Sequence, residues 1–192
     1  MKKILQKKER VLRKIAKEVS IKEIKTPKIQ KVLREMSQAL KSQYDGVAIA
    51  APQIGYSLRI FVVSGKVLEA DFLERGLSQG DGPRGSAGSS EPDSDPTREN
   101  PVVRDLIFIN PKISKLSREK DWVPEGCLSV RWLYGQTFRS KKALITAYDE
   151  KGKKFTRGAS GLLAQIFQHE TDHLNGILFI DHAKDIKEEL PK

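Results

Sequence analysis

Residues 160–176 read SGLLAQIFQHETDHLNG and carry the strongest structural signal in the chain. The Ser160 hydroxyl can cap a helix N-terminus, and Asn175-Gly176 supplies the residue types at which helices commonly stop. The stretch therefore predicts a helix that begins after Ser160 and runs to about Leu174. A short strand is expected directly after it, over residues 177–180, which read ILFI.

Two histidines and a glutamate lie near the end of this expected helix. His169 and His173 are four residues apart, so both imidazoles lie on one face and can reach one cation, while Glu170 stays beside them without ligating it. This is the HExxH arrangement of zinc hydrolases. The alternative is a pair of surface histidines. We favour the metal site because the chain has only three histidines, and Leu162 and Ile166 extend the same face as if it were buried.

A catalytic metal site needs a third protein ligand and an open fourth position. The stretch Glu125-Gly126-Cys127-Leu128-Ser129 offers the chain's one cysteine. A lone cysteine is usually a small core residue. Beside a histidine pair that lacks a third ligand, the thiolate becomes the preferred candidate, and Gly126 would let the backbone approach closely.

The remaining apolar patterns predict further helices and strands. Helices are expected over residues 10–18 and 28–43, the second with Pro27 at its start and one apolar stripe. Strands are expected over the following stretches: 58–63, 106–109 (ended by Asn110-Pro111), and a hairpin of 143–148 with 154–156. The order of helix, strands and helix predicts the α+β class and a single compact domain over residues 1–192.

Residues 78–100 differ from the rest of the chain. They contain no Val, Ile, Leu, Met, Phe, Trp, Tyr or Cys, and are rich in Ser, Gly, Pro and Asp. Such a stretch cannot bury enough apolar area to offset the entropy of ordering it. We therefore expect a flexible surface insertion within the domain.

Composition limits the classes of function. The chain has 192 residues and a net charge of +10, and residues 1–41 alone carry 14 Lys/Arg against 4 Asp/Glu. No apolar run approaches the roughly 20 residues of a membrane helix, and the first residues, MKKILQKKER, do not read as a secretory signal. A single cysteine, Cys127, excludes an intramolecular disulfide and favours a reducing compartment. The basic segment is either a solvated surface or a face for RNA or the ribosome; it holds no aromatic residue before Tyr44.

Three motifs resemble those of the peptide deformylases, which remove the formyl group from the N-terminal methionine of new polypeptides. Residues 46–53 (GVAIAAPQ) resemble the GxGxAAxQ box, residues 125–129 (EGCLS) match the EGCLS box, and residues 168–176 (QHETDHLNG) match the QHExDHLxG box. The resemblance implies antiparallel β-sheets packed around a central helix that carries HExxH. It also implies a metallohydrolase whose substrates are N-formylmethionyl nascent peptides.

The resemblance assigns roles to residues at the motif positions. It implies one divalent cation held by Cys127, His169 and His173; Fe²⁺ is typical of the family, and Zn²⁺, Ni²⁺ or Co²⁺ can occupy the site. Glu170 would accept a proton from a water whose pKa the metal lowers from 15.7 toward roughly 7, and deliver it to the leaving amine. The resemblance assigns Gln53 and the Leu128 N–H to the oxyanion, and the following residues to the substrate: Gly46, Val47, Ala48, Glu125, Gly126 and Ile166. Arg139 is expected to pair with Glu125 and brace the loop of Cys127. Asp172, also behind the metal ligands, either holds a ligand histidine through its carboxylate or caps local charges.

The sequence departs from the family pattern in two places. Ala48 replaces the second glycine of the first box, which would strain the loop if that position needs a positive φ. Arg131 and Trp132 stand where Pro and Gly are common, and they are expected to alter the rim of the cleft. The third histidine, His182, is expected to have a surface or structural role.

Two other functions share part of these features. A general zinc endopeptidase would share HExxH but not the EGCLS box. A binding protein that has lost catalysis would not need Glu170 and the three ligands intact. A weak ribosome association through the basic N-terminal third can coexist with catalysis, and no membrane or DNA partner is expected. A bacterial-type cytoplasm is favoured over an organelle, because the resemblance begins almost at residue 1.

Overall fold

The computed structural model describes residues 2–67 and 104–190. The helical elements are α1 (Pro27–Lys41), α3 (Gly161–Leu174) and the 3-10 turns η1 (Arg10–Arg13), η2 (Ile21–Glu23), η3 (Ala51–Ile54) and η4 (Phe179–Asp181). The strands are β1 (Ala48–Ala50), β2 (Ile60–Val63), β3 (Leu106–Leu116), β4 (Lys120–Gly126), β5 (Leu133–Ser140), β6 (Lys142–Tyr148), β7 (Lys154–Ser160) and β8 (Lys184–Glu188). The chain is thus one compact α+β domain. The expected insertion at 78–100 lies outside the described residues.

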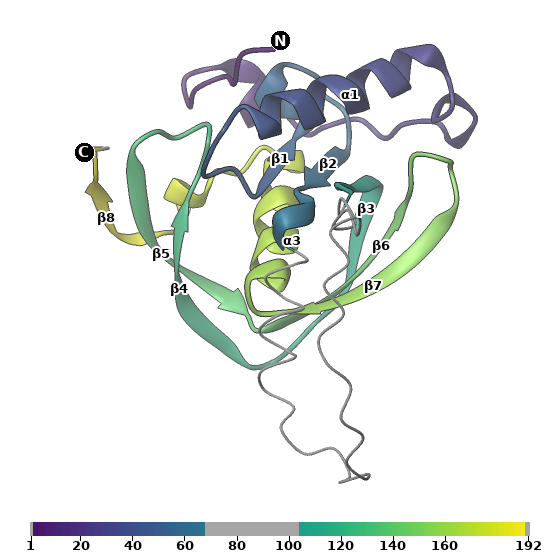
Figure 1. Ribbon diagram of the computed structural model, residues 1–192. Coiled ribbons are helices and arrows are strands. Elements are labelled where there is room, and N and C mark those ends of the chain that lie inside the picture. The colour runs from purple at the N-terminus through teal and green to yellow at the C-terminus, as the bar shows by residue number, and fades with distance from the viewer. Residues whose placement is uncertain (1, 68–103, 191–192) are drawn as a thin grey trace, which may run out of the picture.

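Two antiparallel sheets surround α3. One has five strands in the order β1-β2-β3-β6-β7, and the other has three in the order β4-β5-β8. Figure 1 shows α3 standing between them, with α1 across one side of the larger sheet. The predicted central helix is confirmed, as are the helix over 28–43 and the hairpin, which are α1 and β6–β7.

The period of two along β1, β2 and β3 gives the larger sheet two apolar faces. Phe61 and Phe108 face α3, where their rings stack 4.5 Å apart and meet Phe167. Ile60 and Ile109 face the opposite way, into the apolar stripe of α1. A strand buried on both faces holds its neighbours in a fixed register, so this sheet is a rigid support for α3.

Two sequence predictions of secondary structure are wrong. Residues 10–18 form only the short turn η1, because the chain beyond it runs extended: the Ala16 N–H donates to the Leu174 carbonyl, and Lys17 bridges to Leu58. Residues 177–180 are not a strand but lead into η4, where the Asp181 carboxylate accepts the Leu178 N–H at 2.9 Å.

The third strand does not end at Asn110-Pro111 as predicted. β3 continues to Leu116 through a register shift, with Asn110 at φ 49°. The Asn110 side chain accepts the Val19 N–H at 2.8 Å and donates to the Val19 carbonyl at 2.7 Å. These two bonds fix the bulge and tie the N-terminal segment to the sheet.

Within the described residues, no helix is both long and apolar enough to cross a bilayer.

Candidate metal centre and cleft

The histidines of α3 come together as their spacing predicts. His169 and His173 lie one turn apart, and their ring centroids are 4.9 Å from each other. His173 and Glu170 are buried, because this part of α3 packs between the two sheets. Leu162, expected on the same buried face, is instead 51% exposed at the edge of the cleft described below, so the buried face begins at Ile166.

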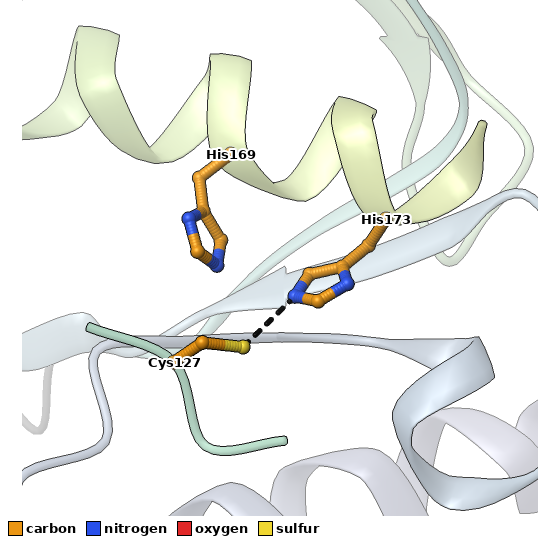
Figure 2. A group of neighbouring side chains, drawn as sticks. All are labelled: Cys127, His169 and His173. Atoms are coloured by element: carbon orange, nitrogen blue, oxygen red, sulfur yellow. Dashed lines mark hydrogen bonds between the residues drawn. The ribbon is translucent and has the colours of Figure 1, made fainter. Parts of the chain in front are cut away.

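Cys127 follows directly after β4 and faces these histidines, as Figure 2 shows. Its Sγ lies 3.2 Å from His173 Nε2. The Ser129 N–H points at the same sulfur, with a distance of 3.4 Å, and Gln53 Nε2 lies 3.6 Å from it. One ligand atom from each of Cys127, His169 and His173 falls within 4.8 Å of the others.

This cluster has the donor chemistry of a divalent metal site. A thiolate and two imidazole nitrogens are borderline-soft ligands, which suit Zn²⁺, Fe²⁺, Co²⁺ or Ni²⁺ better than Mg²⁺ or Ca²⁺. His169 Nδ1 lies 3.2 Å from a Glu125 carboxylate oxygen, so its other nitrogen is left for the cation. Three protein ligands leave a position for water, as catalytic sites require. The residues therefore fit such a cation.

A buried ion-pair network lies behind the cluster. The Arg139 guanidinium donates two hydrogen bonds to Glu125, at 2.8 and 3.0 Å, and a third to Asp172 at 2.7 Å. Burial opposes ionisation of Glu125, but the hydrogen bonds from His169 and Arg139 outweigh it and lower its pKa to about 2. Glu125 therefore stays ionised beside His169, and it is Glu125 rather than Asp172 that contacts a candidate ligand histidine.

The third histidine, His182, is outside the ligand cluster, and its Nε2 lies 4.0 Å from Asp172.

The Glu170 carboxylate differs from that of Glu125 in its hydrogen bonding and in the direction of its pKa shift. It is buried, it borders the cleft, and its Oε2 has no hydrogen-bond partner within the described part of the chain. Burial raises its pKa to about 7, against the attraction of His169. A carboxyl group of this kind can accept and return a proton at neutral pH.

Gln53 and Leu128 supply two further polar groups near the cluster. Gln53, on η3, is held by the Ala50 N–H, which donates to its Oε1 at 2.8 Å, while its Nε2 donates to Ser129 Oγ at 3.1 Å. The Leu128 N–H donates to no acceptor in the described residues, and its carbonyl accepts from Gln6. Both residues border the cleft described below, so an oxygen of a bound molecule could accept from their amide groups.

A cleft of about 310 Å³ opens beside the metal cluster. Val47, Ala48 and Ile166 give it apolar walls, and Gly46, Glu125 and Gly126 also border it. The expectation of a strained loop at Ala48 is wrong: Ala48 lies in β1, opposite Val63, and is not among the residues with positive φ. Glycine is needed at Gly126 for another reason, because a Cβ there would lie 2.6 Å from the Tyr134 ring.

The rim of the cleft carries an ion pair that joins its two walls. Arg131, after β4, contacts Asp45, before β1, with one N–O distance of 2.9 Å, and donates to Gln43 at 3.1 Å. Arg131 also lies over the Trp132 ring. The sequence flagged Arg131 and Trp132 but not Asp45, because no local pattern connects residues 86 positions apart. The contact of Ser129 with Gln53 could have been predicted, because Ser129 lies inside the EGCLS motif. No sequence pattern indicates the contact of Gln6 with the Leu128 carbonyl.

The fold and this site define a class: metallohydrolases that hold one cation with a cysteine and the two histidines of an HExxH helix. Comparison with known proteins agrees and narrows the class. The family model for polypeptide deformylase matches residues 1–189. The chain belongs to the polypeptide deformylase family, the metal-dependent hydrolases that remove the N-terminal formyl group from nascent peptides.

Relatives and solved structures support this membership. A peptide deformylase of Carboxydothermus hydrogenoformans is 37% identical over 176 residues, which cover 92% of this chain and 89% of the relative. A peptide deformylase from Borreliella burgdorferi is 35% identical over 168 residues, which cover 84% of this chain and 81% of the relative. The Thermotoga maritima structure has a TM-score of 0.70 at 30% identity, covering 96% and 98% of the two chains. A Synechococcus elongatus peptide deformylase structure in complex with actinonin has a TM-score of 0.70 at 30% identity, and the match covers 96% of this chain and 79% of that chain.

Proposed function

We propose that this chain hydrolyses the formyl amide of N-formylmethionyl peptides, with Glu170 as the general base and then the general acid. The observation that carries the proposal is the placement of Glu170: a buried carboxylate with a free oxygen, on the cleft and one residue from a candidate metal ligand. Glu170 would take a proton from the attacking water and return it to the amine that leaves. Proton transfer of this kind contributes about 10²- to 10⁴-fold to a rate.

Cys127, His169 and His173 would hold the cation, and Glu125 with Arg139 would keep His169 in the orientation that ligation needs. A divalent metal supplies Lewis acidity and lowers the pKa of water. Of the metals that suit these ligands we propose Fe²⁺ in the cell, with Zn²⁺, Ni²⁺ and Co²⁺ as substitutes. The Fe²⁺ form should then lose activity in air faster than the Ni²⁺ form, because iron at a thiolate site is open to oxidation. Equal decay would argue against iron.

Gln53 and the Leu128 N–H would stabilise the oxyanion that forms on the formyl carbon. Gln53 Nε2 carries two hydrogens, which in the absence of substrate point at Ser129 Oγ and the Cys127 sulfur. A developing negative oxygen is a stronger acceptor than either. Loss of one such donor typically costs about 10²- to 10³-fold in kcat. Gln53→Ala should therefore lower kcat more than it raises KM.

The apolar part of the cleft would take the methionine side chain. Val47 and Ile166 provide the hydrophobic contacts, and Gly46, Ala48 and Gly126 leave room for the peptide backbone beside them. Glu125 was expected to contact substrate, but its carboxylate is engaged by Arg139 and His169, so we assign it to supporting the ligands.

The test is formate release from formyl-Met-Ala-Ser by anaerobically purified protein loaded with Fe²⁺ or Ni²⁺. Metal-dependent release is expected, with a loss of about 10²- to 10⁴-fold in Glu170→Gln at an unchanged melting temperature. Glu9→Gln, on an exposed residue outside the cleft, is the matched control. Unchanged release in Glu170→Gln would exclude Glu170 as the base. Cleavage of unformylated Met-Ala-Ser would point to an endopeptidase instead.

We further propose a cytoplasmic location and a weak ribosome association through residues 1–41. The thiolate ligand supports a reducing compartment, and the lysines of this segment are exposed. Charge reversal at Lys2, Lys3, Lys7 and Lys8 should reduce co-sedimentation with ribosomes. Unchanged co-sedimentation would rule the association through this segment out.

A further inference from the structure

The outer face of the three-stranded sheet combines exposed aromatic rings with lysines. In the register of β4 and β5, Trp122 lies directly opposite Phe138, so the two side chains share the face that points away from α3. Their ring centroids are 5.2 Å apart, yet Trp122 is 41% exposed and Phe138 is 50% exposed. Large rings in contact with each other and open to solvent are unusual on a protein surface, and such patches commonly mark binding sites.

Lysines surround this ring pair. Lys184 Nζ lies 4.4 Å from the centre of the Trp122 ring, and Lys120 Nζ lies 5.7 Å from that of Phe138. Lys187 is opposite Tyr134 in the register of β5 and β8, on the same face. This arrangement places positive charge directly beside two stackable rings.

Acidic groups lie at the edges of this face. Glu119 and Asp121 stand where β4 begins, and both contact Lys141. Glu188 is opposite Leu133, at the far end of β5, and Asp185 stands at a bulge of β8. The positions between them, around Trp122 and Phe138, carry lysines.

We propose that this face, formed by Trp122, Phe138, Lys120, Lys184 and Lys187, binds single-stranded RNA. Bases stack on exposed aromatic side chains of a sheet while lysines contact the phosphates, which is how several RNA-binding modules work. An acidic peptide would use the lysines but would leave the rings without a stacking partner. RNA is favoured over DNA because the family acts on nascent peptides, which leave an RNA-rich particle. The basic N-terminal segment, in contrast, offers charge without rings.

The position of the face relative to the cleft is consistent with this role. Tyr134 belongs to the same face and also borders the cleft, where its ring covers Gly126. Trp122 and Phe138 lie four residues along β4 and β5 from Gly126 and Tyr134, so RNA held on these rings would lie near the cleft without blocking the metal cluster. The proposal does not depend on which residue is the general base.

The experiment is fluorescence anisotropy of a labelled 12-nucleotide oligouridylate, titrated with the full chain at several KCl concentrations. Trp122→Leu with Phe138→Leu should weaken binding by at least roughly 30-fold, because two stacked bases are lost. Lys120→Gln with Lys184→Gln should reduce the slope of log K against log [KCl] by up to about 1.4. The matched control, Lys151→Gln with Lys153→Gln on the exposed turn between β6 and β7, should leave the affinity within about twofold. Deformylation of a formyl peptide should stay unchanged in all of them.

Four results would overturn the proposal. These are no binding at 50 mM KCl, full binding by the Leu variant, tighter binding of oligodeoxythymidylate than of oligouridylate, and preferred binding of an acidic peptide or anionic vesicles. If the Leu variant were to lose its cooperative melting transition, the Lys120→Gln, Lys184→Gln variant keeps the rings and decides the outcome by its salt slope.

Discussion

The two sheets of this protein differ in what covers them. The five-stranded sheet packs α3 against one face and α1 against the other, and its central strands bury Phe61, Val62 and Phe108 completely. The three-stranded sheet turns one face to α3 and the other to solvent. The first sheet therefore supports the helix that carries the histidines. The second delivers Cys127 at the end of β4 and Arg139 on β5, so the site is assembled between a scaffold and a more open layer.

The largest expected effect is the difference between two phenylalanine substitutions, one in each sheet. Phe108→Ala removes a ring packed on Phe61, Phe155 and Phe167, and should lower the free energy of unfolding by about 3–5 kcal/mol. Phe138→Ala on the outer face of the smaller sheet should cost under about 1 kcal/mol, because the residue is already 50% exposed. Urea unfolding of both variants checks this. Equal losses would contradict the division into scaffold and open layer.

Arg139 is the strongest polar connection between the smaller sheet and α3. Arg139→Met would leave Glu125 buried without its guanidinium and free Asp172 on α3, so the expected loss is about 3 kcal/mol. Lys141→Met, two positions from Arg139 and exposed, removes only the contacts with Glu119 and Asp121, so its loss of stability should be much smaller than that of Arg139→Met. Chemical denaturation of the two variants compares them, and a loss in Lys141→Met as large as in Arg139→Met would refute the ranking.

Asn110 tests how firmly the larger sheet holds the N-terminal segment. Asn110→Ala loses both hydrogen bonds with Val19 and places a Cβ-bearing residue without a local hydrogen bond at φ 49°, so about 2–3 kcal/mol should be lost. Asn110→Gly loses the same bonds but tolerates the backbone, and should be more stable than the alanine variant by about 1 kcal/mol. Melting curves measured in parallel give this order. The reverse order would mean that φ at this bulge carries no strain.

The same contrast between the sheets explains how much could be predicted from the sequence. β2, the first half of β3 and β6 are rich in buried β-branched and aromatic residues, and the sequence predicts a strand at each of them. The more exposed second half of β3 and the end of β7 lie beyond the predicted strand ends. β4 reads KDWVPEG and β8 reads KDIKE; these contain charges and a proline because one face meets solvent, so neither was predicted. β1 and β5 were not predicted either, although β1 is fully buried, because its three residues are too few to show a pattern.

The candidate site shows the same division. The ligand cluster could be predicted because HExxH has a helical period and the EGCLS motif is local in sequence. The rim could not be predicted, because Asp45, Gln6 and Arg131 meet only after the chain has folded. Ala48 shows the limit of motif reasoning in the opposite direction: the suspected strain disappears once β1 places it in an extended strand.

The smallest expected effect concerns the pair Asp45–Arg131, which connects the walls of the cleft at its exposed rim. The hydrogen bond from Arg131 lowers the pKa of Asp45, although partial burial opposes this. Because the folded-state pKa lies below the unfolded value of 3.8, the pair stabilises the fold above about pH 4 and this contribution disappears as the pH falls through the folded-state pKa. Asp45→Asn should therefore cost under about 1 kcal/mol at pH 7, and the difference from the unsubstituted chain should shrink in acid and in high salt.

Glu119→Gln, at another exposed pair, is the control for this measurement. If Asp45→Asn costs several kcal/mol at pH 7, the rim would be a second structural connection between the sheets, comparable to Arg139. A small, salt-sensitive loss would instead mean that the two sheets are joined firmly only through α3 and its buried charges. The rim residues could then be replaced without loss of the fold.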